Sequence, residues 1–243
     1  MTERKRADLL LVERGLFESR AKAQAAIAAG LVTANGITVA KASDGIAVDA
    51  AIHAEAEHPW VSRGGVKLTA ALDHFGLDPK NRVCLDIGAS TGGFSHVLLE
   101  RGAKNVYAVD VGRGQLHASL RARPEILSLE ATDIRSLSPQ QLPEPPDLVV
   151  IDVSFISLKL VLPSVLALTK RPTQLVALIK PQFEAGRANL KKGVVRDTHV
   201  HQAVCDDIIT FTVGLGWHVL GVIPSPVTGG DGNREFLLGA RHD

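Results

Sequence analysis

One stretch of the sequence, residues 84–94, combines an acidic residue, three glycines and two hydroxyl side chains in an order suited to holding a ligand. It reads Cys-Leu-Asp-Ile-Gly-Ala-Ser-Thr-Gly-Gly-Phe. An apolar run ends at Ile87 and a helical pattern begins at Phe94, which predicts a strand, a tight loop and a helix. Glycine lets the backbone approach a ligand closely, and the first turn of a helix offers unpaired N–H groups. The stretch therefore predicts a nucleotide-type cradle.

The composition of this loop narrows the class of ligand. A dinucleotide fingerprint requires glycine where this chain has Ser90, and no lysine follows to make a P-loop. The acidic Asp86 near the end of the strand suits a cationic ligand better than a phosphate. A glycine-rich loop with a purely structural role is the alternative at this point.

Further apolar segments, separated by helical patterns, predict a largely parallel sheet covered on both faces. They cover residues 106–109, 127–130, 147–151 and 175–179, and two late strands are expected at 218–223 and 235–238. Helices are expected at 63–75, capped by Ser62, and at 204–215. Ligands of such sheets bind at the carboxyl ends of the strands. The polar residues expected at those ends are Asp86, Asp110, Asp133, Asp152 and Lys180.

Spacing gives one of these residues a specific role. Asp110 follows Asp86 by 24 residues, where a carboxylate accepts the ribose hydroxyls of an adenosine-containing ligand. Helix capping is the alternative role for Asp110 and Asp133.

A separate, smaller module is expected over residues 1–57. Helices are predicted at 7–14 and 20–29, the second with Ser19 as its N-cap. The Asn35-Gly36 pair between apolar residues predicts a hairpin, and a further strand is expected at 51–55. Pro59 disfavours helix at its neighbour, so residues 58–61 are expected to link this module to a second domain at 62–243.

Composition sets broad limits. The chain has 243 residues, with 27 Lys and Arg against 26 Asp and Glu, so any nucleic acid would have to be held by local basic patches. Cys84 and Cys205 fit neither a disulfide framework nor a zinc site, so no metal is expected. No signal peptide or convincing membrane span is found. We expect a cytoplasmic protein that is a monomer and has no membrane partner.

The cradle resembles the first motif of class I S-adenosylmethionine (SAM) methyltransferases, D-x-G-x-x-x-G-G-F. The resemblance implies an α/β, Rossmann-like sheet with SAM as cofactor, and Asp133 resembles the residue that reads the adenine amino group. The implied cofactor-binding residues are Asp86, Gly88, Ser90, Thr91, Gly92, Gly93, Phe94, Asp110 and Asp133.

Two features that the sequence lacks limit which kind of atom could be methylated. The D/N-P-P-Y/F signature of amino-group methyltransferases is replaced by Asp-Val-Ser-Phe at 152–155, and neither cysteine sits where carbon-5 methylation needs a nucleophile. The remaining set matches the K-D-K-E tetrad of ribose 2′-O-methyltransferases and has matching flanks. Its catalytic members would be Lys67, Asp152, Lys180 and Glu235.

The N-terminal module resembles the αL RNA-binding motif, through Arg6, Ser19-Arg20-x-Lys22-Ala23, Gly30-x-Val32 and Val39-x-Lys41. Such a small α+β module docks on structured RNA, and a charged, solvated surface is the alternative. The expected RNA-binding residues are Arg6, Arg20, Lys22, Lys41 and Arg63, with Arg187, Lys191 and Lys192 next in line.

Together the two domains resemble the TlyA family of rRNA methyltransferases, a family that also carries the label haemolysin A. The resemblance implies SAM-dependent 2′-O-methylation of a cytidine ribose in ribosomal RNA or a ribosomal subunit, with Lys180 as general base. The chain ends shortly after Leu238, as in the short members that act on the large subunit. The alternatives are an RNA-binding assembly factor with a vestigial SAM pocket and a haemolysin.

Overall fold

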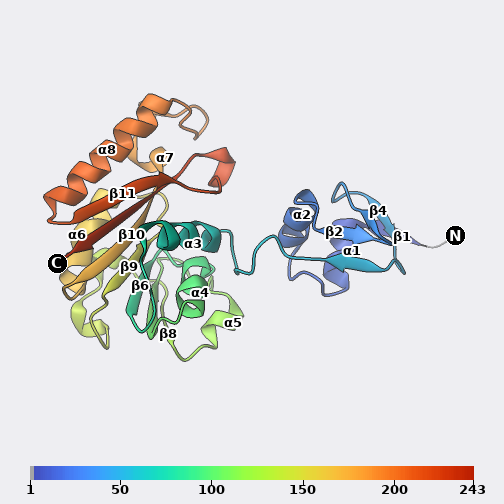
Figure 1. Ribbon diagram of the computed structural model, residues 1–243, viewed down its shortest axis with the longest axis horizontal. Helices are drawn as coiled ribbons and strands as arrows, with labels where there is room; N and C mark the ends of the chain where they lie inside the picture. Colours follow the sequence, from blue (N-terminus) through green and yellow to red (C-terminus); the bar gives the residue numbers. More distant parts are fainter. Residues whose placement is uncertain (1–2) are drawn as a thin grey trace. The chain divides into compact units, whose positions relative to one another are not determined.

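A computed structural model describes residues 3–243, apart from the side chain of Arg187. The chain divides into two compact units, Met1–Pro59 and Trp60–Asp243. Figure 1 shows that each unit has its own sheet and helices. Among the described residues, no helix is both long and apolar enough to cross a membrane.

The first unit is built from two helices and short strands. The helices are α1 (Ala7–Glu13) and α2 (Arg20–Ala28), and Ser19 accepts a hydrogen bond from the Lys22 amide, as the N-cap prediction required. Strands β2 (Val32–Ala34) and β3 (Ile37–Thr38) form the predicted hairpin around Asn35 and Gly36, which both have positive φ. Strand β5 (Ile52–Ala54) completes that sheet, while β1 (Arg4–Arg6) pairs with β4 (Gly45–Ala47).

The second unit contains a seven-stranded sheet in the order β11-β12-β10-β9-β6-β7-β8. The five parallel strands are β6 (Val83–Ile87), β7 (Asn105–Val109), β8 (Ile126–Leu129), β9 (Leu148–Ile151) and β10 (Thr173–Ile179). Strand β12 (Phe236–His242) runs antiparallel to both of its neighbours, β10 and β11 (His218–Pro224). The predicted α/β class is confirmed.

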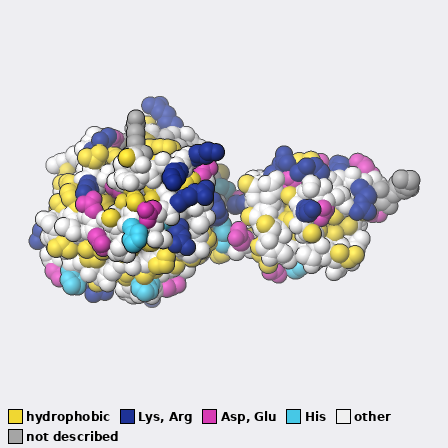
Figure 2. All heavy atoms as spheres, turned by 90° about the horizontal axis from the view of Figure 1, so that it is seen from above, with side chains coloured by type: hydrophobic (Ala, Val, Ile, Leu, Met, Phe, Trp, Pro, Cys, Tyr) yellow, Lys and Arg dark blue, Asp and Glu magenta, His cyan; other side chains and the backbone are white. Residues whose placement is uncertain are grey.

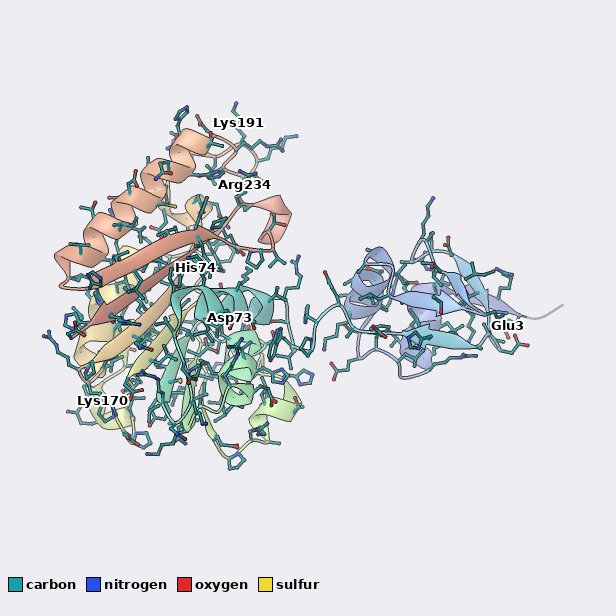
Figure 3. The ribbon with its side chains drawn as sticks, viewed as in Figure 1. Glu3, Asp73, His74, Lys170, Lys191 and Arg234 are labelled. Atoms are coloured by element: carbon teal, nitrogen blue, oxygen red, sulfur yellow. The ribbon has the colours of Figure 1, made fainter. Side chains whose placement is uncertain are left out.

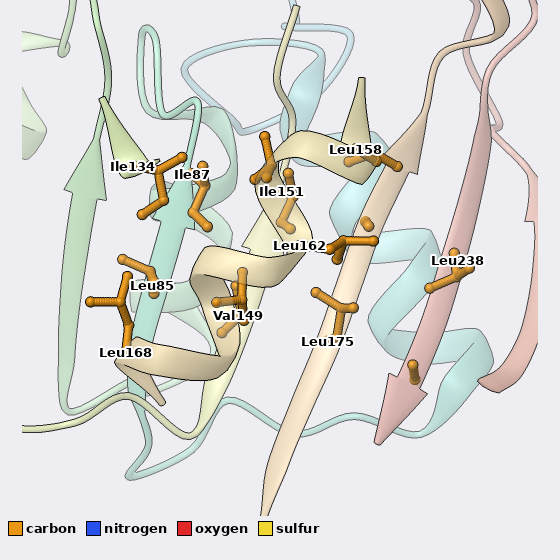
Figure 4. Packing of buried hydrophobic residues seen from close by; sticks show 14 of the residues in the cluster. Leu85, Ile87, Ile134, Val149, Ile151, Leu158, Leu162, Leu168, Leu175 and Leu238 are labelled. Carbon is orange, nitrogen blue, oxygen red and sulfur yellow. The ribbon is translucent and has the colours of Figure 1, made fainter. Parts of the chain in front are cut away.

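Helices cover both faces of this sheet because the side chains of its strands alternate between two apolar cores. Leu85 and Val149 belong to one core, with helices α6 (Leu158–Leu168) and α8 (Thr198–Gly214). Figure 4 shows α6 laid across this face. Cys84 and Leu148 belong to the other core, with α3 (Gly64–Phe75) and α4 (Gly93–Glu100). The remaining short helices are α5 (Ala118–Arg121), α7 (Pro181–Glu184) and the 3₁₀ turns η1 (Ile134–Ser136), η2 (Pro139–Gln141), η3 (Arg187–Asn189) and η4 (Gly230–Gly232).

One local prediction is wrong. Ser62 does not cap α3: the N-cap residue is Arg63, and no side chain caps that helix end. Asp133 lies four residues beyond Leu129, the last residue of β8, and caps η1. In the segment between them Ala131 has a positive φ, and the amides of Ala131 and Thr132 donate hydrogen bonds to the backbone oxygens of Gly112 and Asp110.

Candidate functional site

The cradle is shaped by two glycines that no other residue could replace without strain. Gly88 and Gly92 have φ angles of 84° and 93°. A Cβ on Gly88 would lie 2.4 Å from the backbone oxygen of Asp152, and one on Gly92 would collide with Leu116 and Leu120. The loop after β6 is therefore packed tightly against the loop after β9, which brings the predicted catalytic segments together.

A cavity of about 310 Å³ opens at the carboxyl edge of the sheet, above this cradle. Its walls come from the start of α3, the cradle, the ends of β9 and β10, and the segment before β12. All four residues of the predicted tetrad line it. The cradle and α3 residues on its wall are Ser62, Arg63, Gly64, Gly88, Ala89, Ser90, Thr91, Gly93 and Phe94.

The four tetrad residues form two ion pairs that are largely shielded from solvent. Lys67 Nζ lies 2.6 Å from Glu235 Oε2, with side chains that are 10% and 3% exposed. Lys180 Nζ lies 2.6 Å from Asp152 Oδ1 and donates a hydrogen bond to Ser154 Oγ at 2.9 Å. Two lysines and two carboxylates thus share one small cavity, where charges interact more strongly than in water.

Glu235 is held by a loop that is itself fixed by a buried amide. Asn233 donates to the backbone oxygens of Gly193 and Gly230, and its Oδ1 accepts from the Val195 amide. These bonds tie the segment that leads into α8 to the segment that leads into β12. Figure 3 shows Lys191 and Arg234 on these two segments.

Asp86 occupies a different place from the one expected. Its side chain is completely buried beneath the cradle, and it does not line the cavity. Ser95 Oγ donates a hydrogen bond of 2.6 Å to Oδ2, while Oδ1 has no hydrogen-bond partner. Burial raises the pKa of Asp86 to about 7. A positive charge bound above the cradle would favour the ionised carboxylate.

A second cavity, of about 160 Å³, adjoins the first and shares Gly88 and Ser154 with it. Asp110 lies on its wall and accepts hydrogen bonds from the amides of Ser90, at 2.8 Å, and Gly112, at 2.7 Å. Each carboxylate oxygen can accept a further bond, so Asp110 remains able to bind hydroxyl groups.

Asp133 also lines the second cavity, and its contacts are those of a cap. It accepts a hydrogen bond from the Arg135 amide at 2.9 Å and pairs with Nη2 of the same residue at 2.6 Å. The side chain of Arg135 holds the pKa of Asp133 below its usual value. Asp133 therefore acts as a helix cap, which was the alternative role considered for it. Its predicted contact with an adenine ring stays a prediction.

The chemistry of the two cavities fits SAM. This molecule has ribose hydroxyls, which a carboxylate such as Asp110 accepts, and a cationic sulfur, which Asp152 and the buried Asp86 would stabilise. An extended ligand could occupy both cavities because they meet at Gly88 and Ser154. No cluster of metal-ligating side chains occurs among residues 3–243.

In the first unit, a buried carboxylate gathers two of the predicted RNA-binding residues. Asp8 is fully buried and pairs with Arg6 Nε at 3.0 Å and Arg20 Nη2 at 2.8 Å, while Gln24 donates to it at 2.8 Å. The hydrogen bond from Arg6, together with Arg20 and Gln24, holds the pKa of Asp8 well below its usual range despite its burial. Both guanidinium groups are about half exposed, so they stand together on one surface.

The other predicted RNA-binding residues are less constrained. Lys22 pairs with Glu18 at 2.6 Å, and Lys41 is exposed. Arg63 belongs to the second unit, where it is exposed and lines the main cavity. Figure 2 shows other Lys and Arg side chains gathered on one face of the larger unit.

Sequence reasoning missed Asp8, Ser154, Phe155 and Asn233. Phe155 is 91% exposed, adopts a φ of 64° and lies with its ring centroid 5.0 Å from that of Phe183. Phe155 and Phe183 each lie three residues after a charged tetrad residue, Asp152 after β9 and Lys180 after β10. This short spacing from the charged residues is the one signal in the sequence that could have identified Ser154 and Phe155.

Comparison with known proteins agrees with this geometry. Residues 60–242 match the model of the FtsJ-like methyltransferase family. The chain is 43% identical over 244 residues to "16S/23S rRNA (cytidine-2'-O)-methyltransferase TlyA" of Mycobacterium tuberculosis, covering 99% of this chain and 91% of that protein. It is 38% identical to "Hemolysin A" of Brachyspira hyodysenteriae, covering 96% and 98% of the two chains. A solved structure from Streptococcus thermophilus, described as a candidate hemolysin, has a TM-score of 0.78 and 41% identity, with 100% and 90% coverage.

Proposed function

Because the chain belongs to the FtsJ-like methyltransferase family and to its TlyA group, we propose that it methylates the ribose 2′-hydroxyl of a cytidine in ribosomal RNA. It is an enzyme whose cofactor is SAM. The large-subunit RNA is the proposed substrate, although the M. tuberculosis relative is named for both 16S and 23S RNA. The reaction would take place in the cytoplasm and would need one copy of the chain.

The observation that carries this proposal is the meeting of Lys67, Asp152, Lys180 and Glu235 in one cavity beside the cradle. A ribose hydroxyl is a poor nucleophile until its proton is removed, so a base must lie within hydrogen-bond reach. Lys180 would accept that proton when its amine is neutral. SAM, when bound, supplies a methyl group on a positively charged sulfur.

The other three residues of the tetrad would position the reacting groups and stabilise the charge that develops. Lys67, held by Glu235, would orient the hydroxyl and stabilise the negative charge that develops on its oxygen. Asp152 would hold the Lys180 side chain at the cavity wall. These interactions act in a largely shielded site, where charges interact more strongly than in water.

Two features support RNA as the substrate. The rings of Phe155 and Phe183 stand beside the catalytic segments, and exposed aromatic side chains stack on unpaired bases. In the first unit, Arg6, Arg20 and Lys22 would contact phosphates, as side chains that set the position of the RNA. Lys41 and Arg63 would extend these contacts.

The proposal is tested by incubating the protein with labelled SAM and rRNA that lacks the modification. Transfer of label to a ribose oxygen supports the proposed reaction. RNA binding without any transfer would instead support the assembly-factor alternative, in which the SAM pocket is vestigial.

Asp110→Ala is expected to weaken SAM binding by about 1.5–3 kcal/mol, because charge-assisted hydrogen bonds to the ribose are lost. Asp110→Asn, which keeps one side-chain oxygen, should show a smaller loss. Titration calorimetry measures both affinities, and thermal unfolding checks that the cradle, which Asp110 also supports through Ser90 and Gly112, survives. Unchanged affinity in a folded Asp110→Ala protein would contradict the assignment.

Removing Arg6, Arg20 and Lys22 by alanine substitution is expected to weaken RNA binding and leave SAM affinity unchanged. Each lost phosphate contact should lower the slope of log affinity against log salt by about 0.7–0.9. The matched control is Lys104→Ala, another exposed lysine in an ion pair with a glutamate. If the triple variant keeps both affinity and slope, the RNA surface lies elsewhere, with Lys191 and Lys192 tested next.

A further inference from the structure

Two oxygen atoms contact the amine of Lys180, and they contribute differently. Asp152 Oδ1 lies 2.6 Å away as an ion pair, but this oxygen accepts no hydrogen bond in the structure. Ser154 Oγ accepts a hydrogen bond from Nζ at 2.9 Å. The carboxylate of Asp152 therefore attracts the amine by its charge, while the hydroxyl of Ser154 fixes the direction of one N–H bond.

The amine of a neutral lysine has two N–H groups and one lone pair, arranged around the nitrogen with the Cε bond. One N–H is directed at Ser154, and the carboxylate of Asp152 attracts the second and repels the lone pair. The lone pair then points along the one position around the nitrogen that neither N–H group nor the Cε bond occupies. With one of these two oxygens missing, the lone pair could occupy either of two directions.

We propose that Ser154 is a positioning residue that fixes the lone pair of Lys180 toward the main cavity, whose wall Lys180, Asp152 and Ser154 all share. This inference rests on the proposed function, in which Lys180 is the general base. Ser154 itself touches no reacting atom in this account.

The proposed methyl transfer needs no reactant besides the ribose hydroxyl, SAM and Lys180. The O–H bond of the ribose hydroxyl breaks, and its proton goes to the lone pair of Lys180. The electron pair left on the oxygen forms the bond to the methyl carbon, and the pair of the methyl–sulfur bond stays on sulfur. The resulting ammonium group donates one N–H to Ser154 and keeps its ion pair with Asp152.

Ser154 is well suited to a test because it is exposed and lies outside any helix or strand. Ser154→Ala is therefore expected to fold normally. It should lower the single-turnover rate of methyl transfer about tenfold to a hundredfold, the range expected when a reacting group is misplaced by about 1 Å. Ser154→Thr, which keeps the hydroxyl, should recover most of the rate. RNA affinity should stay within about twofold of wild type, and the rates are compared at saturating SAM because Ser154 lies where the two cavities meet.

The matched control is Ser128→Ala, an exposed serine on β8 that lines neither cavity. A second readout needs neither cofactor nor RNA. Nuclear magnetic resonance of protein labelled with nitrogen-15 lysine measures how fast the Nζ hydrogens of Lys180 exchange with water. This exchange should be faster in Ser154→Ala than in wild type, Ser154→Thr or Ser128→Ala.

The outcomes separate this inference from the proposed function. If Ser154→Ala keeps the wild-type rate, or Ser154→Thr is as slow as Ser154→Ala, the positioning role is overturned. Unchanged hydrogen exchange would overturn it as well. If wild-type protein itself transfers no methyl group to rRNA, the proposed function fails, and the exchange measurement still decides whether Ser154 holds the amine.

Discussion

Replacing Lys180 by arginine is expected to lower single-turnover methyl transfer about 10²- to 10⁴-fold, the usual contribution of general base catalysis. Arginine keeps the positive charge and can still pair with Asp152, but its guanidinium group does not lose a proton in proteins. Lys180→Ala should be equally inactive. SAM and RNA should bind both variants, because Lys180 acts on the hydroxyl and not on either ligand's affinity.

The comparison of Lys180→Arg with Lys180→Ala separates two roles for this side chain. The control is Lys104→Arg, which makes the same change in an exposed ion pair with Glu144. If Lys180→Arg keeps a rate near that of wild type while Lys180→Ala does not, Lys180 contributes charge and is not the base.

Removing one member of the buried pair between Lys67 and Glu235 is expected to have the largest effect on stability. Lys67→Met leaves the carboxylate of Glu235 buried without its partner, which should lower the free energy of unfolding by about 3–5 kcal/mol. Denaturant unfolding measures this loss. Methyl transfer should also be lost, since Lys67 is the residue proposed to orient the hydroxyl.

A double replacement separates structure from catalysis. Lys67→Met with Glu235→Leu removes both charges, and replacing a buried pair by apolar side chains is often neutral for stability. This double variant should regain most of the stability lost in Lys67→Met and remain inactive. Recovery of activity together with stability would show that the pair is structural and has no part in the reaction.

The strands and the cradle could be predicted from sequence because each depends on local information. Buried parallel strands are continuous apolar runs, and the glycines of the loop at 88–93 mark a backbone that packs closely. The hairpin at Asn35 and Gly36 and the N-cap at Ser19 follow equally local rules. These features agree with the structure for that reason.

Contacts between distant segments could not be predicted in the same way. That Lys67 pairs with Glu235 depends on β12 running antiparallel beside β10, and that Lys180 pairs with Asp152 depends on β9 lying beside β10. No local pattern reports either arrangement. The strand pair of β1 and β4 was also missed, because each strand has three residues and little apolar alternation.

The position of Asp86 shows a different limit of prediction from the sequence. Its place in the motif implied contact with the cofactor, but a residue inside β6 points either to the ligand or to the core according to the pleat. The structure puts the carboxyl group under the cradle, against Ser95. Asp133 caps η1 and also lines the second cavity, so its role toward a ligand stays a prediction.

The central claim is that Lys180 and its partners methylate a ribose in ribosomal RNA. Its most direct test is to map 2′-O-methylated nucleotides in rRNA from cells that lack this protein, before and after treatment with SAM and either wild-type protein or Lys180→Ala. We expect one new 2′-O-methylcytidine in the large-subunit RNA with the wild-type protein and none with Lys180→Ala. A methyl group found on a base, or no new methylation in either subunit, would contradict the account.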